Sequence, residues 1–156
     1  MSDKTLRRAL SSEKDTRDLA ACLALLARRG DVIALEGDLG AGKTVFARAF
    51  VSALGGGDEV PSPTFTLVQS YDSASGPIHH FDLYRLGSPE DTFELGLEEL
   101  LPDGISLIEW PDRLGPYMPK DHLIIRMIEN STTLRFVEAV GAGDWVHRLD
   151  DLKELF

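Results

Sequence analysis

The chain has 156 residues and a mass of 17.2 kDa, a size that suits one domain spanning residues 1–156 with a substantial hydrophobic core. Hydrophobic residues make up 43% and charged residues 27%, which is typical of a globular protein and excludes a disordered one. With 16 basic and 26 acidic residues the formal net charge is −10, which disfavours a protein that grips RNA or DNA by itself through a basic face. Any phosphate that the chain binds must therefore be held by backbone geometry and a few well-placed cations.

The cysteine content and the hydropathy pattern indicate a cellular compartment. Cys22 is the only cysteine, which excludes an intrachain disulfide and favours a reducing cytosol. The longest apolar run, residues 20–27, is too short to cross a bilayer, and the polar segment before it does not resemble a signal peptide. We therefore expect a cytoplasmic protein without a membrane segment, in which Cys22 is buried as a small hydrophobic side chain.

Hydrophobic periodicity predicts strands and helices that alternate along the first half of the chain. Ser12, with Asp15 three residues on, resembles a capping box at the start of a helix, and Gly30 is predicted to end that helix. The predicted strands are 5–10, 32–35, 64–71, 78–86, 105–108, 123–128 and 133–140. The first predicted helix has its apolar residues at helical spacing, at Leu19, Cys22, Leu23 and Leu26. Further helices are predicted over 44–54, in short segments within 88–101, and at the end of the chain, where Trp145, Leu149, Leu152 and Phe156 lie on one face. This order implies an α/β fold of three layers, in which helices flank a mixed central sheet.

Residues 37–44 carry the strongest functional signal. They match the P-loop pattern G-x-x-x-x-G-K-[ST] as Gly37, Asp38, Leu39, Gly40, Ala41, Gly42, Lys43 and Thr44. The glycines let backbone N–H groups curl around phosphates at a helix N-terminus. Lys43 can reach the β- and γ-phosphates, and the Thr44 hydroxyl can ligate Mg²⁺. Because the pattern follows an apolar strand and opens a helix, as the motif requires, we expect a nucleotide site here.

A P-loop enzyme also needs an acidic group on an adjacent strand to hold its metal ion. Two segments within or at the end of predicted strands finish on a carboxylate: residues 105–109, which are apolar, on Glu109, and residues 78–82, which are less apolar, on Asp82. We expect both acids near the metal. Either acid taken alone could equally be a solvated strand end. His79 and His80 invite a zinc hypothesis, but adjacent residues of a strand face opposite sides, which disfavours it.

The residues favour ATP over GTP and hydrolysis over phosphate transfer. A guanine-specific GTPase would carry an Asn-Lys-x-Asp motif, whereas the only asparagine is Asn130, followed by serine. Residues 112–115 fit a D-x-x-G switch, but a pattern with two wildcards carries little weight. A small-molecule kinase would need an acceptor pocket and an arginine-bearing lid. The candidate arginines are scattered and are interpreted as surface charges; they are Arg85, Arg113, Arg126 and Arg135.

Four motifs, in this order and spacing, resemble the TsaE (YjeE) ATPases. They are the phosphate loop at 37–44, Ser-Pro-Thr-Phe at 62–65, His-Phe-Asp-Leu-Tyr-Arg at 80–85 and Ile-Glu-Trp at 108–110. The resemblance covers nearly the whole chain. It implies a P-loop NTPase-like fold and a role in the bacterial synthesis of threonylcarbamoyladenosine, a modified nucleoside that follows the anticodon of many tRNAs. Members of the family act with the TsaB–TsaD pair, which binds the tRNA and carries out the carbamoyl transfer, while TsaE hydrolyses ATP to permit repeated turnover.

The same resemblance implies roles for individual residues. Thr44 matches the magnesium ligand of the P-loop, and Asp82 and Glu109 match the family's two acidic positions at the metal. Lys43 and Thr64 complete the expected catalytic set, with Thr64 in a switch-like loop near the γ-phosphate. The other expected contacts are Trp110 beside the nucleotide, Thr16 close to the base, and Tyr84 with Arg85 at the partner.

Two other functions remain open from the sequence. One is a small P-loop kinase that phosphorylates a metabolite, and the other is a nucleotide-gated interaction module in which hydrolysis is incidental. The acidic charge suits a subunit of a complex in which another chain holds the RNA. We therefore expect an ATPase that uses ATP and Mg²⁺, is slow alone, is activated by TsaB–TsaD, and meets tRNA only through that complex.

Overall fold

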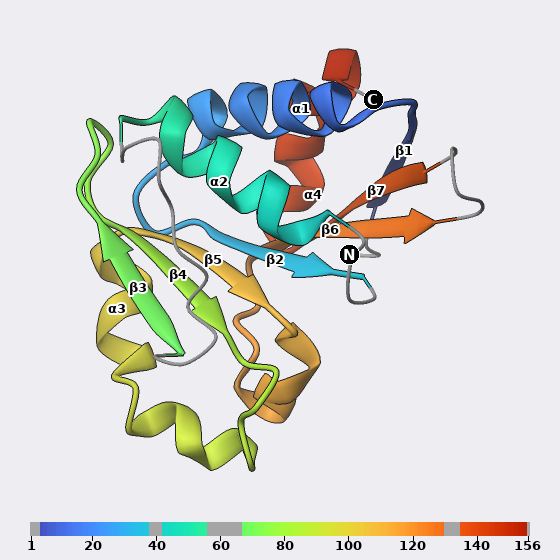
Figure 1. Ribbon diagram of the computed structural model, residues 1–156. Helices are drawn as coiled ribbons and strands as arrows, with labels where there is room; N and C mark the ends of the chain where they lie inside the picture. Colours follow the sequence, from blue (N-terminus) through green and yellow to red (C-terminus); the bar gives the residue numbers. More distant parts are fainter. Residues whose placement is uncertain (1–3, 38–41, 56–66, 130–134, 156) are drawn as a thin grey trace.

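The computed structural model describes residues 4–37, 42–55, 67–129 and 135–155, and arranges their strands in one mixed sheet between helices (Figure 1). The strands in chain order are β1 (Lys4–Leu10), β2 (Val32–Glu36), β3 (Val68–Tyr71), β4 (Ile78–Asp82), β5 (Ile105–Glu109), β6 (His122–Glu129) and β7 (Arg135–Ala142). Across the sheet they lie in the order β1-β7-β6-β2-β5-β4-β3. β2 is parallel to β5 and β6, and β4 is parallel to β5, whereas β1, β3 and β7 are antiparallel to their neighbours. The α/β fold with a mixed sheet is confirmed.

Two predicted strands are shorter in the structure. The strand expected over 78–86 ends at Asp82, because the chain then turns and the backbone N–H of Leu86 donates to the carbonyl of Leu83. The strand expected over 64–71 is observed only as β3, from Val68 onward. Leu67, directly before it, has a φ of 64°, which interrupts extended pairing. Residues 64–66 lie outside the described part of the chain.

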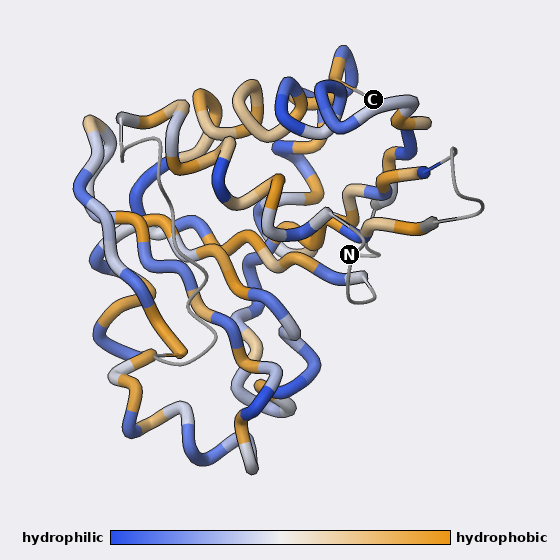
Figure 2. Tube along the Cα trace, viewed as in Figure 1, coloured by the Kyte–Doolittle hydropathy of each residue, from blue (hydrophilic) through white to orange (hydrophobic). Residues whose placement is uncertain are grey.

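Helices cover both faces of the sheet. One face carries α1 (Glu13–Leu26), α2 (Lys43–Ala53), α4 (Trp145–Arg148) and the 3₁₀ helix η3 (Leu149–Leu155); the other carries α3 (Leu97–Asp103) and the 3₁₀ helices η1 (Pro89–Phe93) and η2 (Pro111–Tyr117) (Figure 1). Successive residues of β5 alternate between the two cores. Leu107 packs in the core under α1 and α2 with Phe46, whereas Ile108 packs in the opposite core with Phe81. Figure 2 shows the apolar segments of the strands between these two helical layers.

Helix α1 begins as the sequence indicated, but a different set of residues is buried. The backbone N–H of Asp15 donates to Ser12 Oγ at the N-cap, and the Asp15 carboxylate accepts from the backbone and hydroxyl of Ser11, which lowers the pKa of Asp15. The buried positions are Thr16, Leu19, Ala20, Leu23 and Ala24. At 3.6 residues per turn Cys22 points away from the centre of this stripe, and it is exposed, so the expectation that it is buried was wrong. Gly30 lies in the turn after the helix, which already ends at Leu26.

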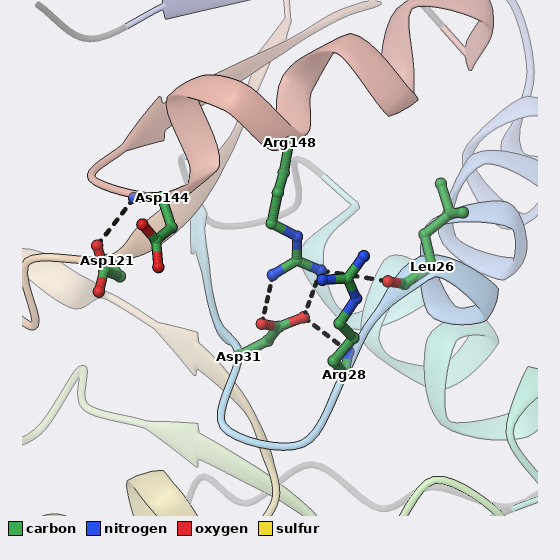
Figure 3. Close-up of polar contacts among 6 residues, drawn as sticks. All are labelled: Leu26, Arg28, Asp31, Asp121, Asp144 and Arg148. Carbon is green, nitrogen blue, oxygen red and sulfur yellow. Dashed lines mark hydrogen bonds and ion pairs between the residues drawn. The ribbon is translucent and has the colours of Figure 1, made fainter. Parts of the chain in front are cut away.

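A charged cluster ties the closing helix to the start of β2 (Figure 3). The Arg148 guanidinium binds both oxygens of the Asp31 carboxylate, at 2.6 and 2.9 Å, and also donates to the carbonyl of Leu26. The backbone N–H of Arg28 donates to the same carboxylate at 2.7 Å. Arg148 in turn lies over the Trp145 ring, 3.8 Å from its centroid. The predicted closing helix is thus present as α4 continuing into η3, with Trp145, Leu149 and Leu152 buried; Phe156 lies outside the described residues.

Within the residues that the structure describes, no helix has the length and apolarity needed to cross a membrane.

Candidate nucleotide site

The predicted phosphate loop connects β2 to α2. Gly37 follows β2, and Gly42 forms the N-cap of α2 with a φ of 100°. A side chain is strained at that φ, so glycine suits the position. The nearest neighbour of a Cβ added there would be Arg135 Nη1, at 3.4 Å, which is an ordinary van der Waals contact. The loop residues Asp38, Leu39, Gly40 and Ala41 lie outside the described residues. The start of α2 directs its first backbone N–H groups out of the helix, which is the arrangement that binds anions.

Lys43 and Thr44 are the first two residues of α2. Lys43 is buried, and its Nζ lies 3.7 Å from the centroid of the Trp110 ring. At this distance the ring face attracts the ammonium group, so the indole compensates part of the lost hydration of Lys43. Thr44 is half-buried beside it. The P-loop lysine and Trp110 are therefore in direct contact.

Trp110 owes its position to an unusual backbone. It follows β5 with a φ of 59° and a ψ of 54°, a left-handed conformation that is uncommon for a bulky residue and costs about 1 kcal/mol or more. The Tyr84 ring packs against the indole with centroids 4.9 Å apart, and Arg113 lies above Tyr84 at 5.9 Å. Tyr84 and Arg85 are both exposed, as a contact with a partner would require.

The two acids lie side by side at the ends of adjacent parallel strands. Asp82 pairs in register with Glu109, and Glu109 also pairs with Leu35 of β2, the strand that leads into the phosphate loop. Both carboxylates are buried, with residue exposures of 8% and 5%. Asp82 Oδ1 accepts from the backbone N–H of Tyr84 at 3.1 Å, and Glu109 Oε2 lies 2.7 Å from His80 Nε2.

The donor set of this edge fits Mg²⁺. Two buried like charges side by side favour a cation between or beside them, and carboxylate and hydroxyl oxygens are the ligands that Mg²⁺ prefers. Among the described residues there is no group of three or more His, Cys, Asp or Glu side chains that could hold a metal by themselves. Mg²⁺ commonly completes its coordination with phosphate oxygens and water instead, so Thr44, Asp82 and Glu109 would suffice beside a bound nucleotide.

The two histidines face opposite sides of the sheet, as expected. His79 Nδ1 lies 2.8 Å from Ser70 Oγ and its Nε2 lies 3.0 Å from Asp103 Oδ2. His80 instead contacts Glu109. His79 therefore ties β3, β4 and the end of α3 together, away from the two acids.

The structure brings most predicted site residues to one edge of the sheet. The structure places five of them where β2, β4 and β5 end and α2 begins: Lys43, Thr44, Asp82, Glu109 and Trp110. Thr64 lies outside the described residues. Thr16 is buried on the inner face of α1, with 3% of its surface exposed, and its place near the base stays a prediction.

Sequence reasoning missed two neighbours of this edge. His80 was considered only for zinc, although its place two residues before Asp82 on a strand puts both on one face. Arg135 was interpreted as a surface charge, yet it lies against Gly42. No local signal marks Arg135, because its position depends on the pairing of β6 with β7.

The fold and the residues at the edge of the sheet where α2 begins define a protein of the P-loop NTPase class. The features of this class that are present are a parallel strand, a glycine-capped helix that starts with Lys-Thr, and acids at the ends of neighbouring strands. The crystal structure of Bacillus subtilis YdiB is similar over 99% of this chain and 96% of that chain, with a TM-score of 0.81 and 30% sequence identity. Residues 10–137 match the family described as threonylcarbamoyl adenosine biosynthesis protein TsaE. The chain belongs to the TsaE family.

Curated relatives carry the same family name. A tRNA threonylcarbamoyladenosine biosynthesis protein TsaE from Rickettsia conorii is 46% identical over 104 residues, which are 66% of this chain and 59% of the relative. The protein of that name from Bacillus subtilis is 37% identical over 123 residues, covering 78% of this chain and 77% of the relative. The match therefore spans about three fifths of the Rickettsia protein and about three quarters of the Bacillus protein.

Proposed function

We propose that this chain is a Mg²⁺-dependent ATPase that serves the synthesis of threonylcarbamoyladenosine in tRNA. Membership of the TsaE family supports the pathway, since the relatives are named for that biosynthesis. The proposed setting is the cytoplasm, where the chain acts with the TsaB–TsaD complex and meets tRNA only through that complex. The net charge of −10 supports the indirect role, because counterion release from a basic surface supplies most protein–RNA affinity.

The observation that carries the proposal is that a buried lysine at the start of α2 and two buried carboxylates at the ends of β4 and β5 lie at the same edge of the sheet. Lys43 is held by Trp110 on one side, and Asp82 pairs in register with Glu109 on the next two strands. A positive group for phosphates and a negative pair for a cation are the two halves of a magnesium–nucleotide site. Bound Mg²⁺ would neutralise charge on the phosphate oxygens.

Each residue then has a defined task. Lys43 leaves the indole face and binds the phosphates, and the Thr44 hydroxyl with the two carboxylates holds the metal or its waters. Trp110 lies beside the nucleotide, and Thr64 acts from a switch-like loop near the γ-phosphate. Rapid cleavage by P-loop proteins commonly needs a further cation or an ordered water supplied by a partner, so the isolated chain hydrolyses ATP slowly.

Reconstituted tRNA modification tests this function. Purified TsaB–TsaD, tRNA, the threonylcarbamoyl donor and ATP are combined with the wild-type chain or with Lys43→Ala, and the modified nucleoside formed per TsaD is measured over time. The proposal expects many turnovers with the wild-type chain and about one with Lys43→Ala. Equal turnover in both reactions, or ATP-dependent phosphorylation of a small acceptor by the chain alone, would contradict it.

A further inference from the structure

The register of β4 and β5 places His80 on the same face of the sheet as the two acids. His80 pairs with Leu107, and Asp82 pairs with Glu109. Since side chains two apart along a strand share a face, all four point toward the side covered by α2. The Leu107 side chain packs in the core on that side, which confirms the direction. His80 therefore lies directly behind the carboxylates, one step further from the end of the strands.

Among the residues that the structure describes, His80 has one hydrogen-bond partner, which is Glu109. The distance between His80 Nε2 and Glu109 Oε2 is 2.7 Å, and the two side chains are only 1% and 6% exposed. A carboxylate accepts hydrogen bonds, so in this pair His80 Nε2 is the donor and Glu109 Oε2 the acceptor. His80 Nδ1 is buried and makes no hydrogen bond to any residue that the structure describes. Keeping the proton off Nδ1 avoids a buried donor without an acceptor.

His79, the neighbouring residue on β4, serves as a comparison, because its contacts are those of a histidine that only supports the fold. His79 is almost as buried as His80, at 4% against 1%, but both of its ring nitrogens have partners, Ser70 and Asp103. At His80 only one ring nitrogen, Nε2, has a partner among the described residues, and that partner is one oxygen of Glu109. A group that fixes one carboxylate oxygen also fixes the direction of the other.

We propose that His80 is a positioning residue for Glu109. It holds Oε2, so that the other carboxylate oxygen is available to Mg²⁺ or to a water bound to it when the nucleotide enters. This inference rests on the proposed function, since it assigns Glu109 to the metal. A ligand held in this way loses little rotational freedom on binding the metal, and groups behind metal ligands typically contribute about 10- to 100-fold to metal affinity or activity.

The test compares His80→Leu and His80→Gln with His79→Leu in the full-length chain. ATP binding is titrated calorimetrically in EDTA and at increasing Mg²⁺, and single-turnover hydrolysis is followed at saturating nucleotide. His80→Leu is expected to bind ATP in EDTA within about 2-fold of wild type and to need about 10-fold more Mg²⁺ for half-saturation. The amide of His80→Gln can donate to the same oxygen, so it should recover most of the Mg²⁺ response. His79→Leu, a change of equal size on the same strand, should leave the Mg²⁺ response as in wild type.

NMR of the nucleotide-free protein provides a readout that does not depend on activity. The ¹⁵N shifts of the His80 ring should report a proton on Nε2, and Glu109→Ala should move them while leaving those of His79 in place. A His80 ring protonated only on Nδ1, or an unaltered Mg²⁺ response in a folded His80→Leu, would overturn the inference. An equal loss in His79→Leu would overturn it as well, because the effect would then be general to β4. If the wild-type chain binds no ATP, the proposed function fails, and the NMR result still decides whether His80 holds Glu109.

Discussion

The buried ion pair between Arg148 and Asp31 at the closing helix is predicted to contribute strongly to the stability of the fold. Arg148→Met keeps an unbranched apolar stem over Trp145 but removes the guanidinium from Asp31. The two side chains are 17% and 10% exposed, so the carboxylate is left nearly buried, and among the described residues the backbone N–H of Arg28 is its one remaining donor. Removing one partner of a buried ion pair costs about 3–5 kcal/mol, and the residual exposure favours the lower end, about 3 kcal/mol. For a chain of this length, that lowers the melting temperature by roughly 6–12 °C.

Thermal and urea unfolding followed by circular dichroism measure this loss. Asp31→Asn and the double variant of Asp31→Asn with Arg148→Met complete a double-mutant cycle. The free energy of unfolding of the double variant should fall by about 2 kcal/mol less than the sum of the two single losses, because no charge is left buried alone. The exposed pair Lys14–Asp18, at 75% and 56% exposure, is the matched control, and Lys14→Met should change stability by less than about 0.5 kcal/mol. Equal effects of Arg148→Met and Lys14→Met would show that the buried pair stabilises the fold no more than an exposed pair does.

Three further predictions concern the nucleotide site. Lys43→Ala should weaken ATP binding by at least about 30-fold in calorimetry while the protein stays folded, because it removes the cation at the start of α2; unchanged affinity would contradict the P-loop assignment. Asp82→Asn and Glu109→Gln should each lower Mg²⁺-dependent hydrolysis by about 100-fold and ATP affinity by much less, and full activity in both would show that other acids hold the metal. Trp110→Phe should abolish the change in fluorescence that ATP causes, since Lys43 leaves its ring, whereas Trp145→Phe should preserve it; the reverse result would exchange their roles.

Much of the fold is predictable because local pattern and tertiary environment agree. The run from Val32 to Leu35 is apolar throughout and becomes a central parallel strand with both faces covered. The predicted pair 123–128 and 133–140 is found as β6 and β7, which are antiparallel. The face of α1 was less predictable, because leucines also occupy its exposed side; Leu25 is 73% exposed and Leu26 39% exposed. Periodicity depends only on where apolar residues occur in the sequence, so it does not distinguish those that pack on the sheet from those that face solvent.

Some features of the candidate site were likewise predictable from the sequence, and others were not. The positions of Asp82 and Glu109 were predictable, because each acid follows a segment with a strand pattern and the ends of parallel strands share an edge of the sheet. The contact between His80 and Glu109 was not, since it needs the register of two strands that are far apart in sequence. The contact of Trp110 with Lys43 likewise depends on a left-handed backbone at a tryptophan, which no sequence pattern indicates.

The rate of ATP hydrolysis by the purified chain decides whether it is an ATPase that TsaB–TsaD activates. It is measured with Mg²⁺ for the chain alone, with tRNA, with TsaB–TsaD, and with both together, using Lys43→Ala as the background in each case. We expect slow hydrolysis by the chain alone, no change with tRNA alone, and a clear increase with TsaB–TsaD that Lys43→Ala abolishes. Fast hydrolysis that ignores TsaB–TsaD, or a rate that Lys43→Ala leaves intact, would contradict the account.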